Sequence, residues 1–328
     1  MSVQSALLRV GDRHPANCLF CSDCQSLVKV VGKDYEYACK AEEFALSQCE
    51  SCGHFFADPM PTREEFGVLY PPTYYTMNHA SPLHLEGFIY RQKIARDVRR
   101  LLSLVNSRNI QSIVDIGCGD AARLFHAAAH SELGGKEFVG IDLMFREEQV
   151  RSAKDAGVTL LQGNVEDGLD VLQDNAFDLA IMSQLVEHLI DPRAALENIR
   201  SKLRPQGLLL IETPCVGSGL DYWLFRRQYW GGYHIPRHLH LFTSQSLSDL
   251  VRQCGYRVVR DGFLPSPGFW IISLRNWFGL NSVKYSSSLL EFLNFSNLFS
   301  VGAFTAFDLF FALTPVKTSN QFALVEKV

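Results

Sequence analysis

Six of the nine cysteines in this 328-residue chain fall between Cys18 and Cys52, and their spacing is typical of a metal site. Two residues separate Cys18 from Cys21, and two separate Cys49 from Cys52. Two pairs of this kind supply four thiolates, the tetrahedral set that zinc prefers in structural sites. A segment of about 50 residues has too small a core to fold well without such a crosslink. We therefore predict a structural Zn2+ bound by Cys18, Cys21, Cys49 and Cys52.

A second choice of ligands stays open, because Cys21 and Cys24 form an equally well spaced pair, while Cys39 is a spare. Met1–His14 is polar and lacks the apolar run of a secretory signal, so we expect a reducing, cytoplasmic setting that disfavours disulfides. Four protein ligands leave no open position for a reactive water, which makes the expected role of the metal structural.

A glycine-rich turn is the first indication of a bound cofactor. Gly117-Cys118-Gly119 follows the apolar run Ser112–Val114 and precedes a helical pattern. Glycines between a strand and a helix let the backbone approach a ligand closely, and the helix N-terminus adds N–H donors. Dinucleotide-binding proteins share this feature, but here Asp115 precedes the first glycine and the third glycine of their pattern is missing.

Polar residues follow the next three apolar runs in chain order. Asp142 ends the first of these runs, where an acid can accept hydrogen bonds from both hydroxyls of a ribose. Asn164-Val165-Glu166 follows the second run, where a polar side chain can meet an adenine ring. The third run, Phe177–Met182, leads into Ser183-Gln184-Leu185-Val186-Glu187-His188-Leu189.

In this order the four features resemble those of class I S-adenosylmethionine-dependent methyltransferases, which carry an Asp-x-Gly-x-Gly motif and a Glu-His-Leu or Glu-His-Val turn after the fourth strand. The resemblance covers residues 110–262 and implies S-adenosylmethionine as the cofactor. It places the glycine loop at the methionine moiety, Asp142 at the ribose and the third loop beside the adenine. The cofactor contacts expected from it are Asp115, Gly117, Cys118, Gly119, Asp142, Leu143, Asn164, Val165, Glu166, Ser183 and Gln184. Two departures are Ala121, where many members have glycine, and Asn164, where aspartate is usual.

The segment Cys49–Pro61 resembles zinc-ribbon modules fused to methyltransferases of this type, in which the first cysteine pair opens the module. That resemblance favours Cys18 and Cys21 over Cys24. Two other functions remain open: a nicotinamide-dependent oxidoreductase on the same architecture, and a non-catalytic binding module. The missing third glycine counts against the former, and the intact Asp115 and Asp142 count against the latter.

Methyl transfer to an oxygen or carbon acceptor requires a group that removes a proton, and histidine can do this near neutral pH. The segment Trp230–Phe242 concentrates three histidines, an arginine and three aromatic residues after the fifth predicted strand, on the side where open α/β folds bind ligands. Related methyltransferases also contain Pro-Arg-His-Leu-x-Leu-Phe. We predict an active-site lid here, with His238 as the base, His234 as the second candidate and Arg237 as an anion or orientation contact.

A parallel sheet must position these residues, since short apolar runs alternate with helical patterns. The expected strands are Ser112–Ile116, Glu137–Ile141, Thr159–Leu161, Phe177–Met182, Leu208–Glu212, Arg257–Gly262 and Gln321–Val328. The expected helices are Gly87–Val105, Ala121–Ser131, Glu147–Ala156, Glu166–Leu172, Pro192–Leu203 and Ser244–Cys254. The predicted fold class is α/β: a Rossmann-like, doubly wound, mostly parallel sheet with a small N-terminal four-cysteine zinc-ribbon domain and a helical insertion before the last strand.

Composition divides the chain into successive segments: a ribbon (1–62), a helical connector (63–107), a cofactor-binding domain (108–264), an aromatic-rich cap (265–318) and a final strand (319–328). The cap has seven phenylalanines between Leu289 and Leu313. Its most apolar part has 16 residues, interrupted by Asp308, whereas a membrane span needs roughly 20. We expect a cover for the sheet, ahead of a homodimer surface or an interfacial helix that reaches a lipid-linked substrate.

Charge and composition limit the partners. With 31 basic and 35 acidic side chains, the formal charge is -4, which supplies no broad positive surface for nucleic acid. We expect a small-molecule or glycosyl acceptor, nucleotide- or lipid-linked, because related zinc-ribbon methyltransferases are associated with sugar, polysaccharide and natural-product pathways. O-methylation ranks ahead of C-methylation, and the expected location is the cytoplasm, with peripheral membrane contact as one option.

Overall fold

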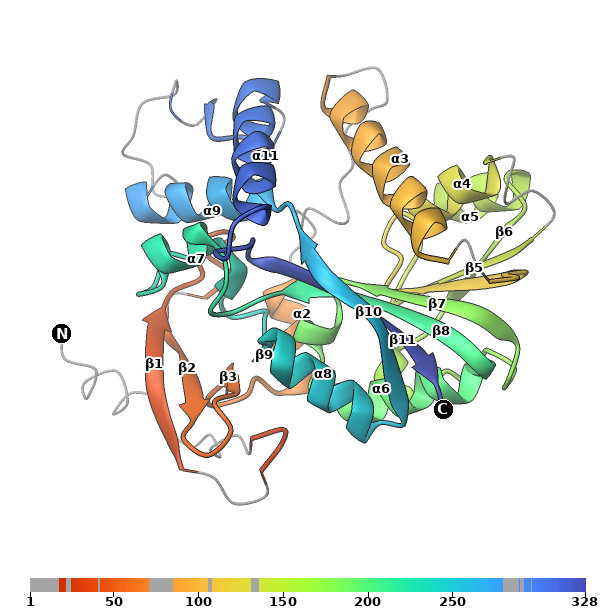
Figure 1. Ribbon diagram of the computed structural model, residues 1–328, viewed down its shortest axis with the longest axis horizontal. Helices are drawn as coiled ribbons and strands as arrows, with labels where there is room; N and C mark the ends of the chain where they lie inside the picture. Colours follow the sequence, from red (N-terminus) through yellow and green to blue (C-terminus); the bar gives the residue numbers. More distant parts are fainter. Residues whose placement is uncertain are drawn as a thin grey trace. The chain divides into compact units, whose positions relative to one another are not determined.

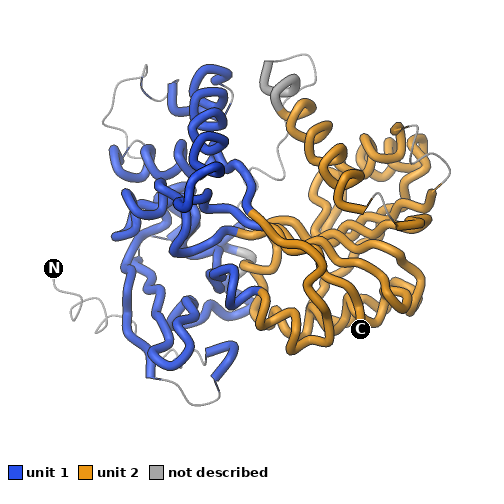
Figure 2. Tube along the Cα trace, in the orientation of Figure 1, with its two compact units in different colours: residues 1–74, 214–247, 263–321 blue, residues 75–213, 248–262, 322–328 orange. Residues whose placement is uncertain are grey.

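The computed structural model describes residues 18–21, 25–40, 42–70, 85–105, 108–130, 136–279, 289, 292–295 and 297–328. The chain forms two compact units, each assembled from separated stretches of sequence (Figure 2). Unit 1 comprises residues 1–74, 214–247 and 263–321, and unit 2 comprises residues 75–213, 248–262 and 322–328. The segments expected from the sequence are consecutive stretches of the chain. The two units, in contrast, are each made of several stretches that contact one another.

Unit 2 is built around a seven-stranded sheet (Figure 1). Its strands are, in spatial order, β10 (Tyr256–Leu264), β11 (Asn320–Lys327), β8 (Leu203–Pro214), β7 (Phe177–Ser183), β4 (Ser112–Ile116), β5 (Glu137–Asp142) and β6 (Val158–Gln162). The five strands from β8 to β6 pair in parallel, with Val114 opposite Val139 on one side and Ala180 on the other. The direction of winding reverses between β4 and β7, which is the point where open α/β sheets bind ligands.

Helices cover both faces of this sheet, as parallel strands require. α3 (Leu85–Val105), α4 (Ala122–Ala128) and α5 (Glu147–Asp155) lie over one face, and α6 (Pro192–Lys202) lies over the other (Figure 1). α8 (Ser244–Gln253) precedes β10. Every residue of β4 is buried, which explains why Ile113, Val114 and Ile116 are apolar.

The predicted fold class is confirmed, and each predicted strand corresponds to one strand of the sheet. The predicted helix Glu166–Leu172 is wrong. Val165–Asp167 forms only a short 3-10 helix, η3, because Gly168 and Leu169 follow with φ values of 110° and 55°. An α-helix of L-residues does not continue through such left-handed conformations.

Unit 1 contains the second sheet, in the order β1 (Ser26–Gly32), β2 (Phe44–Cys49), β3 (Phe55–Ala57) and β9 (His240–Leu241). These strands pair antiparallel, so the histidine-rich segment adds an edge strand to the ribbon. The α-helices of the unit that fall within the described residues include α2 (Arg63–Leu69), α7 (Leu220–Phe225), α9 (Pro267–Phe278) and α11 (Leu298–Ala312). Within the described ranges, no helix combines the length and the apolar character needed to cross a membrane.

Candidate functional site

The glycine turn connects β4 to α4 at the carboxyl edge of the large sheet. Gly117 and Gly119 have φ values of 70° and 59°, which glycine adopts without strain. The N–H groups of Gly117 and Cys118 both donate to the Ile141 carbonyl, at 2.8 and 3.0 Å, and so tie the turn to β5. A Cβ built on Gly119 would meet no atom of the described residues within 4 Å, so these residues leave space for a ligand beside the turn.

Asp142, at the end of β5, lies against this turn. Its Oδ2 accepts from the Gly119 N–H and its Oδ1 from the Leu143 N–H, both at 2.7 Å. Burial raises the pKa of Asp142, and the two N–H donors oppose that shift. A carboxylate has about four acceptor positions, so this one retains capacity for hydroxyl donors such as those of a ribose.

A buried charge network adjoins the turn. Arg123 of α4 places Nη1 at 3.5 Å from Asp115 Oδ2 and Nη2 at 3.4 Å from Glu212 Oε2. Arg100 of α3 pairs with the other oxygen of Glu212. Burial raises the pKa of Asp115 to about 6, although the charge of Arg123 opposes the rise. The network fixes the start of α4 to the ends of β4 and β8.

Ser183 and Gln184, at the end of β7, join the same network. The Ser183 hydroxyl donates to Glu212 Oε2 and accepts from Arg123 Nη2, the latter at 3.1 Å. Gln184 has a φ of 53°, and its N–H donates to the Glu212 carbonyl at 2.7 Å. The sequence analysis did not predict this network. Glu212 could have indicated it, because an acidic residue at the end of a buried apolar strand needs a cation nearby.

The third predicted loop follows β6. Asn164 caps η3, since its Oδ1 accepts from the Glu166 N–H at 3.1 Å and its Nδ2 donates to Asp167 Oδ2 at 3.0 Å. Val165 is buried, and its carbonyl accepts from Asn198 Nδ2 at 2.9 Å. These contacts fix the backbone of the loop, and its expected contact with adenine stays a prediction.

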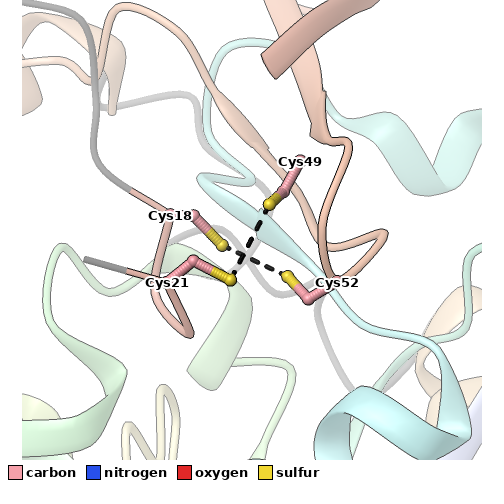
Figure 3. A group of neighbouring side chains, drawn as sticks. All are labelled: Cys18, Cys21, Cys49 and Cys52. Atoms are coloured by element: carbon pink, nitrogen blue, oxygen red, sulfur yellow. Dashed lines mark hydrogen bonds between the residues drawn. The ribbon is translucent and has the colours of Figure 1, made fainter. Parts of the chain in front are cut away.

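The four cysteines predicted as zinc ligands meet in unit 1 (Figure 3). The Sγ atoms of Cys18, Cys21, Cys49 and Cys52 all lie within 4.8 Å of one another. Cys18 Sγ is 3.4 Å from Cys52 Sγ, and Cys21 Sγ is 3.9 Å from Cys49 Sγ. Four thiolates in a tetrahedron about 2.3 Å from one zinc are about 3.8 Å apart, so the donor set fits this metal.

The local backbone helps to present the second pair. Gly53, with a φ of 75°, donates its N–H to the Cys49 carbonyl at 2.9 Å and closes the turn between the thiols. Cys24, the alternative ligand, lies outside the described residues. Cys39 lies 3.5 Å from Arg237 Nη2 and is not part of the cluster.

The histidine-rich segment packs against the ribbon within unit 1. His240 lies opposite Phe56 in the ladder between β3 and β9, and its Nδ1 is 3.1 Å from Nε2 of His54. Both histidines are buried, and burial together with the neighbouring His240 holds the pKa of His54 well below its usual range. This histidine pair therefore supports the fold.

The two histidines predicted as base candidates are also buried. His238 Nδ1 lies 2.8 Å from the Gly232 carbonyl. A carbonyl only accepts, so Nδ1 carries the proton of the neutral ring and Nε2 is its basic nitrogen. His234 Nδ1 lies 2.6 Å from Glu36 Oε1, a contact that suits a protonated nitrogen as well.

Arg237 is fully buried in an ion pair. Its Nη1 and Nη2 donate to Asp34 Oδ1 and Oδ2 at 3.0 and 2.8 Å, and its Nε donates to the Leu69 carbonyl at 2.7 Å. The guanidinium also lies over the ring of Tyr37. Burial acts to raise the pKa of Asp34, but the hydrogen bonds and charge of Arg237 hold it below its usual value. An acceptor contact of the kind predicted for Arg237 would have to replace part of this pairing.

Comparisons with known proteins agree on one kind of domain. A family model described as a methyltransferase domain matches residues 88–261, slightly more than half of the chain. A ubiquinone biosynthesis O-methyltransferase from Cereibacter sphaeroides is 28% identical over 190 residues, which cover 56% of this chain and 75% of that protein. A nocamycin O-methyltransferase from Saccharothrix syringae is 32% identical over 130 residues, or 38% of this chain and 45% of that protein.

One solved structure has a similar fold. Phosphoethanolamine N-methyltransferase 2 from Haemonchus contortus, in complex with phosphomonomethylethanolamine and S-adenosylhomocysteine, superposes with a TM-score of 0.52 at 18% identity. The match covers 99% of this chain and 73% of the other.

Proposed function

The chain belongs to the family of methyltransferase-domain proteins and is an S-adenosylmethionine-dependent methyltransferase, and we propose that its acceptor atom is a hydroxyl oxygen. The curated relatives from Cereibacter sphaeroides, Saccharothrix syringae and Aspergillus sclerotiorum are all named O-methyltransferases, and this observation carries the choice of oxygen over carbon. The family assignment sets aside the oxidoreductase and the non-catalytic module that the sequence alone left open.

We assign the cofactor to the glycine turn and its neighbours. The methionine part would lie at Gly117–Gly119, the ribose hydroxyls at Asp142, and the adenine beside Asn164–Glu166. The open space at Gly119 and the remaining acceptor capacity of Asp142 support this assignment. The cofactor supplies an activated methyl group, and the protein must orient the acceptor and remove its proton.

For the base we retain His238, with His234 as the second candidate. The neutral His238 ring carries its proton on Nδ1, next to the Gly232 carbonyl, so Nε2 has the lone pair that a general base requires. The proposed acceptor is a small molecule or a glycosyl group, nucleotide- or lipid-linked.

We also propose that the cysteine cluster binds one structural Zn2+. The sulfur separations support four thiolate ligands, and such a shell has no open position for a reacting group. Metal binding would therefore stabilise the ribbon and take no part in methyl transfer.

Isothermal titration calorimetry with S-adenosylmethionine and with NADH tests the cofactor assignment. We expect saturable binding of S-adenosylmethionine and none of NADH; the reverse result would remove the assignment. Incubation with methyl-labelled cofactor and hydroxyl-bearing acceptors, followed by mass-spectrometric location of the methyl group, tests the acceptor atom. Label found only on carbon or nitrogen would show that the choice of oxygen is wrong.

A further inference from the structure

Helix α11 exposes several of its large apolar side chains and buries two polar ones. Phe299, Phe310 and Leu313, the last just beyond the helix, are 73%, 63% and 89% exposed. Ser300 and Asp308 are buried in the same helix. A helix that is apolar on its outer face needs another apolar phase or partner to cover it, so this arrangement requires an explanation.

The contacts of Asp308 fix this orientation. Asp308 Oδ1 accepts from Trp270 Nε1 at 2.8 Å, and its Oδ2 accepts from the Ser266 N–H at 2.6 Å. Phe304, on the same side of the helix, stacks on Trp270 with ring centroids 5.7 Å apart. Turning the phenylalanines inward would bring a buried, hydrogen-bonded carboxylate out of its site, so the exposed face is a built feature.

Two further helices of unit 1 also carry exposed apolar side chains: α9, which packs against α11, and α7, which packs against α9 (Figure 1). The Gly219 N–H donates to the Val316 carbonyl at 3.3 Å, which joins the chain after α11 to the start of α7. Phe225 of α7 contacts Trp277 of α9, with ring centroids 5.7 Å apart. We define the aromatic face by its exposed residues on α7, α9 and α11 and just beyond: Trp223, Leu224, Trp277, Phe299, Leu309, Phe310 and Leu313.

The charges that accompany this face are basic. Residues 214–247 and 263–321 supply all three helices, and the exposed charged side chains among their described residues are Arg226, Arg227 and Lys317. Among the described residues of these stretches, the acids are Asp221 and Asp308, and both are buried. This bias contrasts with the chain as a whole, which has a formal charge of -4.

We propose that the aromatic face docks on a bilayer surface that contains anionic lipids. Phenylalanine and tryptophan side chains favour the boundary between headgroups and acyl chains, and arginine and lysine at the rim attract lipid phosphates. Arg226 lies over the ring of Trp223, 4.5 Å from its centroid, which places an aromatic side chain and a cation together as such an interface requires.

Charge and helix length favour a bilayer surface over a second copy of the chain and over a helix that crosses the membrane. Two copies of the face would bring like charges together, which disfavours a second copy of the chain. α11 has 15 residues and is about 22 Å long, shorter than the roughly 30 Å hydrocarbon core, so it lies in the interface and does not cross it. The proposal concerns where the enzyme acts and does not depend on the identity of its acceptor.

Vesicle flotation of the full chain tests this docking. We expect binding to vesicles of phosphatidylcholine with phosphatidylglycerol, and at least tenfold weaker binding by the double variant Phe299→Ser, Phe310→Ser. The variant Arg226→Gln, Arg227→Gln should lose the preference for phosphatidylglycerol and the sensitivity to salt. Val259→Ser, which changes an exposed apolar residue of unit 2, is the matched control and should bind like the unaltered protein.

Three results would overturn the proposal: no binding of the unaltered chain to either vesicle, equal binding by all variants, or a dimer that dissociates in Phe299→Ser, Phe310→Ser without any vesicle binding. The last would assign the face to a second copy. Thermal unfolding checks that each variant is folded, and Leu313→Ser replaces the double variant if that one does not fold.

Discussion

Asp34 and Arg237 lie 203 positions apart in the chain and form an ion pair in which neither side chain is exposed. The pair joins the turn after β1 to the histidine-rich segment. Because a charge without a partner is costly inside a protein, each residue depends on the other for its place in unit 1. We therefore expect the loss of either residue to lower the stability of the fold, and to change catalysis only as a consequence.

Replacing Arg237 with methionine should lower the free energy of unfolding by about 3–5 kcal/mol, because Asp34 would remain buried without its cation. Denaturant unfolding measures this change. The control is Arg252→Met, which removes an exposed ion pair with Asp249 and should change stability by less than about 0.5 kcal/mol. Unchanged stability in Arg237→Met, together with a raised KM for the acceptor, would instead support the contact role predicted from the sequence.

Replacing Asp142 with alanine should weaken S-adenosylmethionine binding by roughly 1–3 kcal/mol, because the ribose hydroxyls would lose their acceptor and the Gly119 N–H its partner. Calorimetry measures this loss. Asp155→Ala, on the exposed end of α5, is the matched control and should bind the cofactor normally. Equal affinities in the two variants would exclude the carboxylate of Asp142 from the cofactor site.

Replacing Cys49 with serine should abolish stoichiometric zinc and lower the stability of the ribbon, because three thiolates do not complete the tetrahedral shell. Metal analysis of the purified protein measures the content. Cys39→Ser should retain the metal, since Cys39 lies beside Arg237 and outside the cluster. Full zinc content in Cys49→Ser would show that another residue serves as the ligand.

Asp115 should make the stability of the cofactor-free protein fall as the pH rises from about 4 to about 6. Burial raises the pKa of Asp115 to about 6 in the folded protein, so the folded state holds a proton that the unfolded chain has already released. The loss is on the order of 3 kcal/mol and is complete above that window. Asp115→Asn should remove this part of the slope in urea unfolding, and Asp155→Asn should not. An unchanged slope in Asp115→Asn would contradict the shifted pKa.

Replacing His238 with glutamine should lower kcat about 10²- to 10⁴-fold if its imidazole removes the acceptor proton. The affinity for S-adenosylmethionine should not change, because His238 is not among the residues proposed to bind the cofactor. His240→Gln is the comparison within the same segment, because His240 pairs with His54 and has no predicted chemical role. An equal loss of activity in both variants would point to damage to the fold in place of lost base catalysis.

The sequence predicts the large sheet well, because its buried parallel strands appear as apolar runs that end in polar residues. The contact between Asp142 and the glycine turn follows from that pattern, since the carboxyl ends of neighbouring parallel strands share one edge. The helix predicted at Glu166–Leu172 is absent because Gly168 ends η3. This glycine is the residue in the sequence that argues against a helix there.

Other features had no local signal. A two-residue strand such as β9 shows no periodicity, so its pairing with β3 could not be predicted. The pairing of Arg123 with both Asp115 and Glu212 depends on which of several arginines the fold brings there. The ion pair between Asp34 and Arg237 likewise depends on tertiary packing. Neither segment contains a sequence pattern that identifies the partner.

The pairing of β3 with β9 makes the cysteine ribbon an integral part of the protein and not a detachable appendage. A truncation before Arg63 would remove the neighbour of β9 and leave an unpaired strand edge, a recognised starting point for aggregation. If the cluster binds zinc as we propose, chelation would act in the same way, by destabilising the ribbon strands beside β9. A chelator would then be expected to lower methyl transfer by destabilising unit 1, with no contact between the proposed structural metal and the substrate.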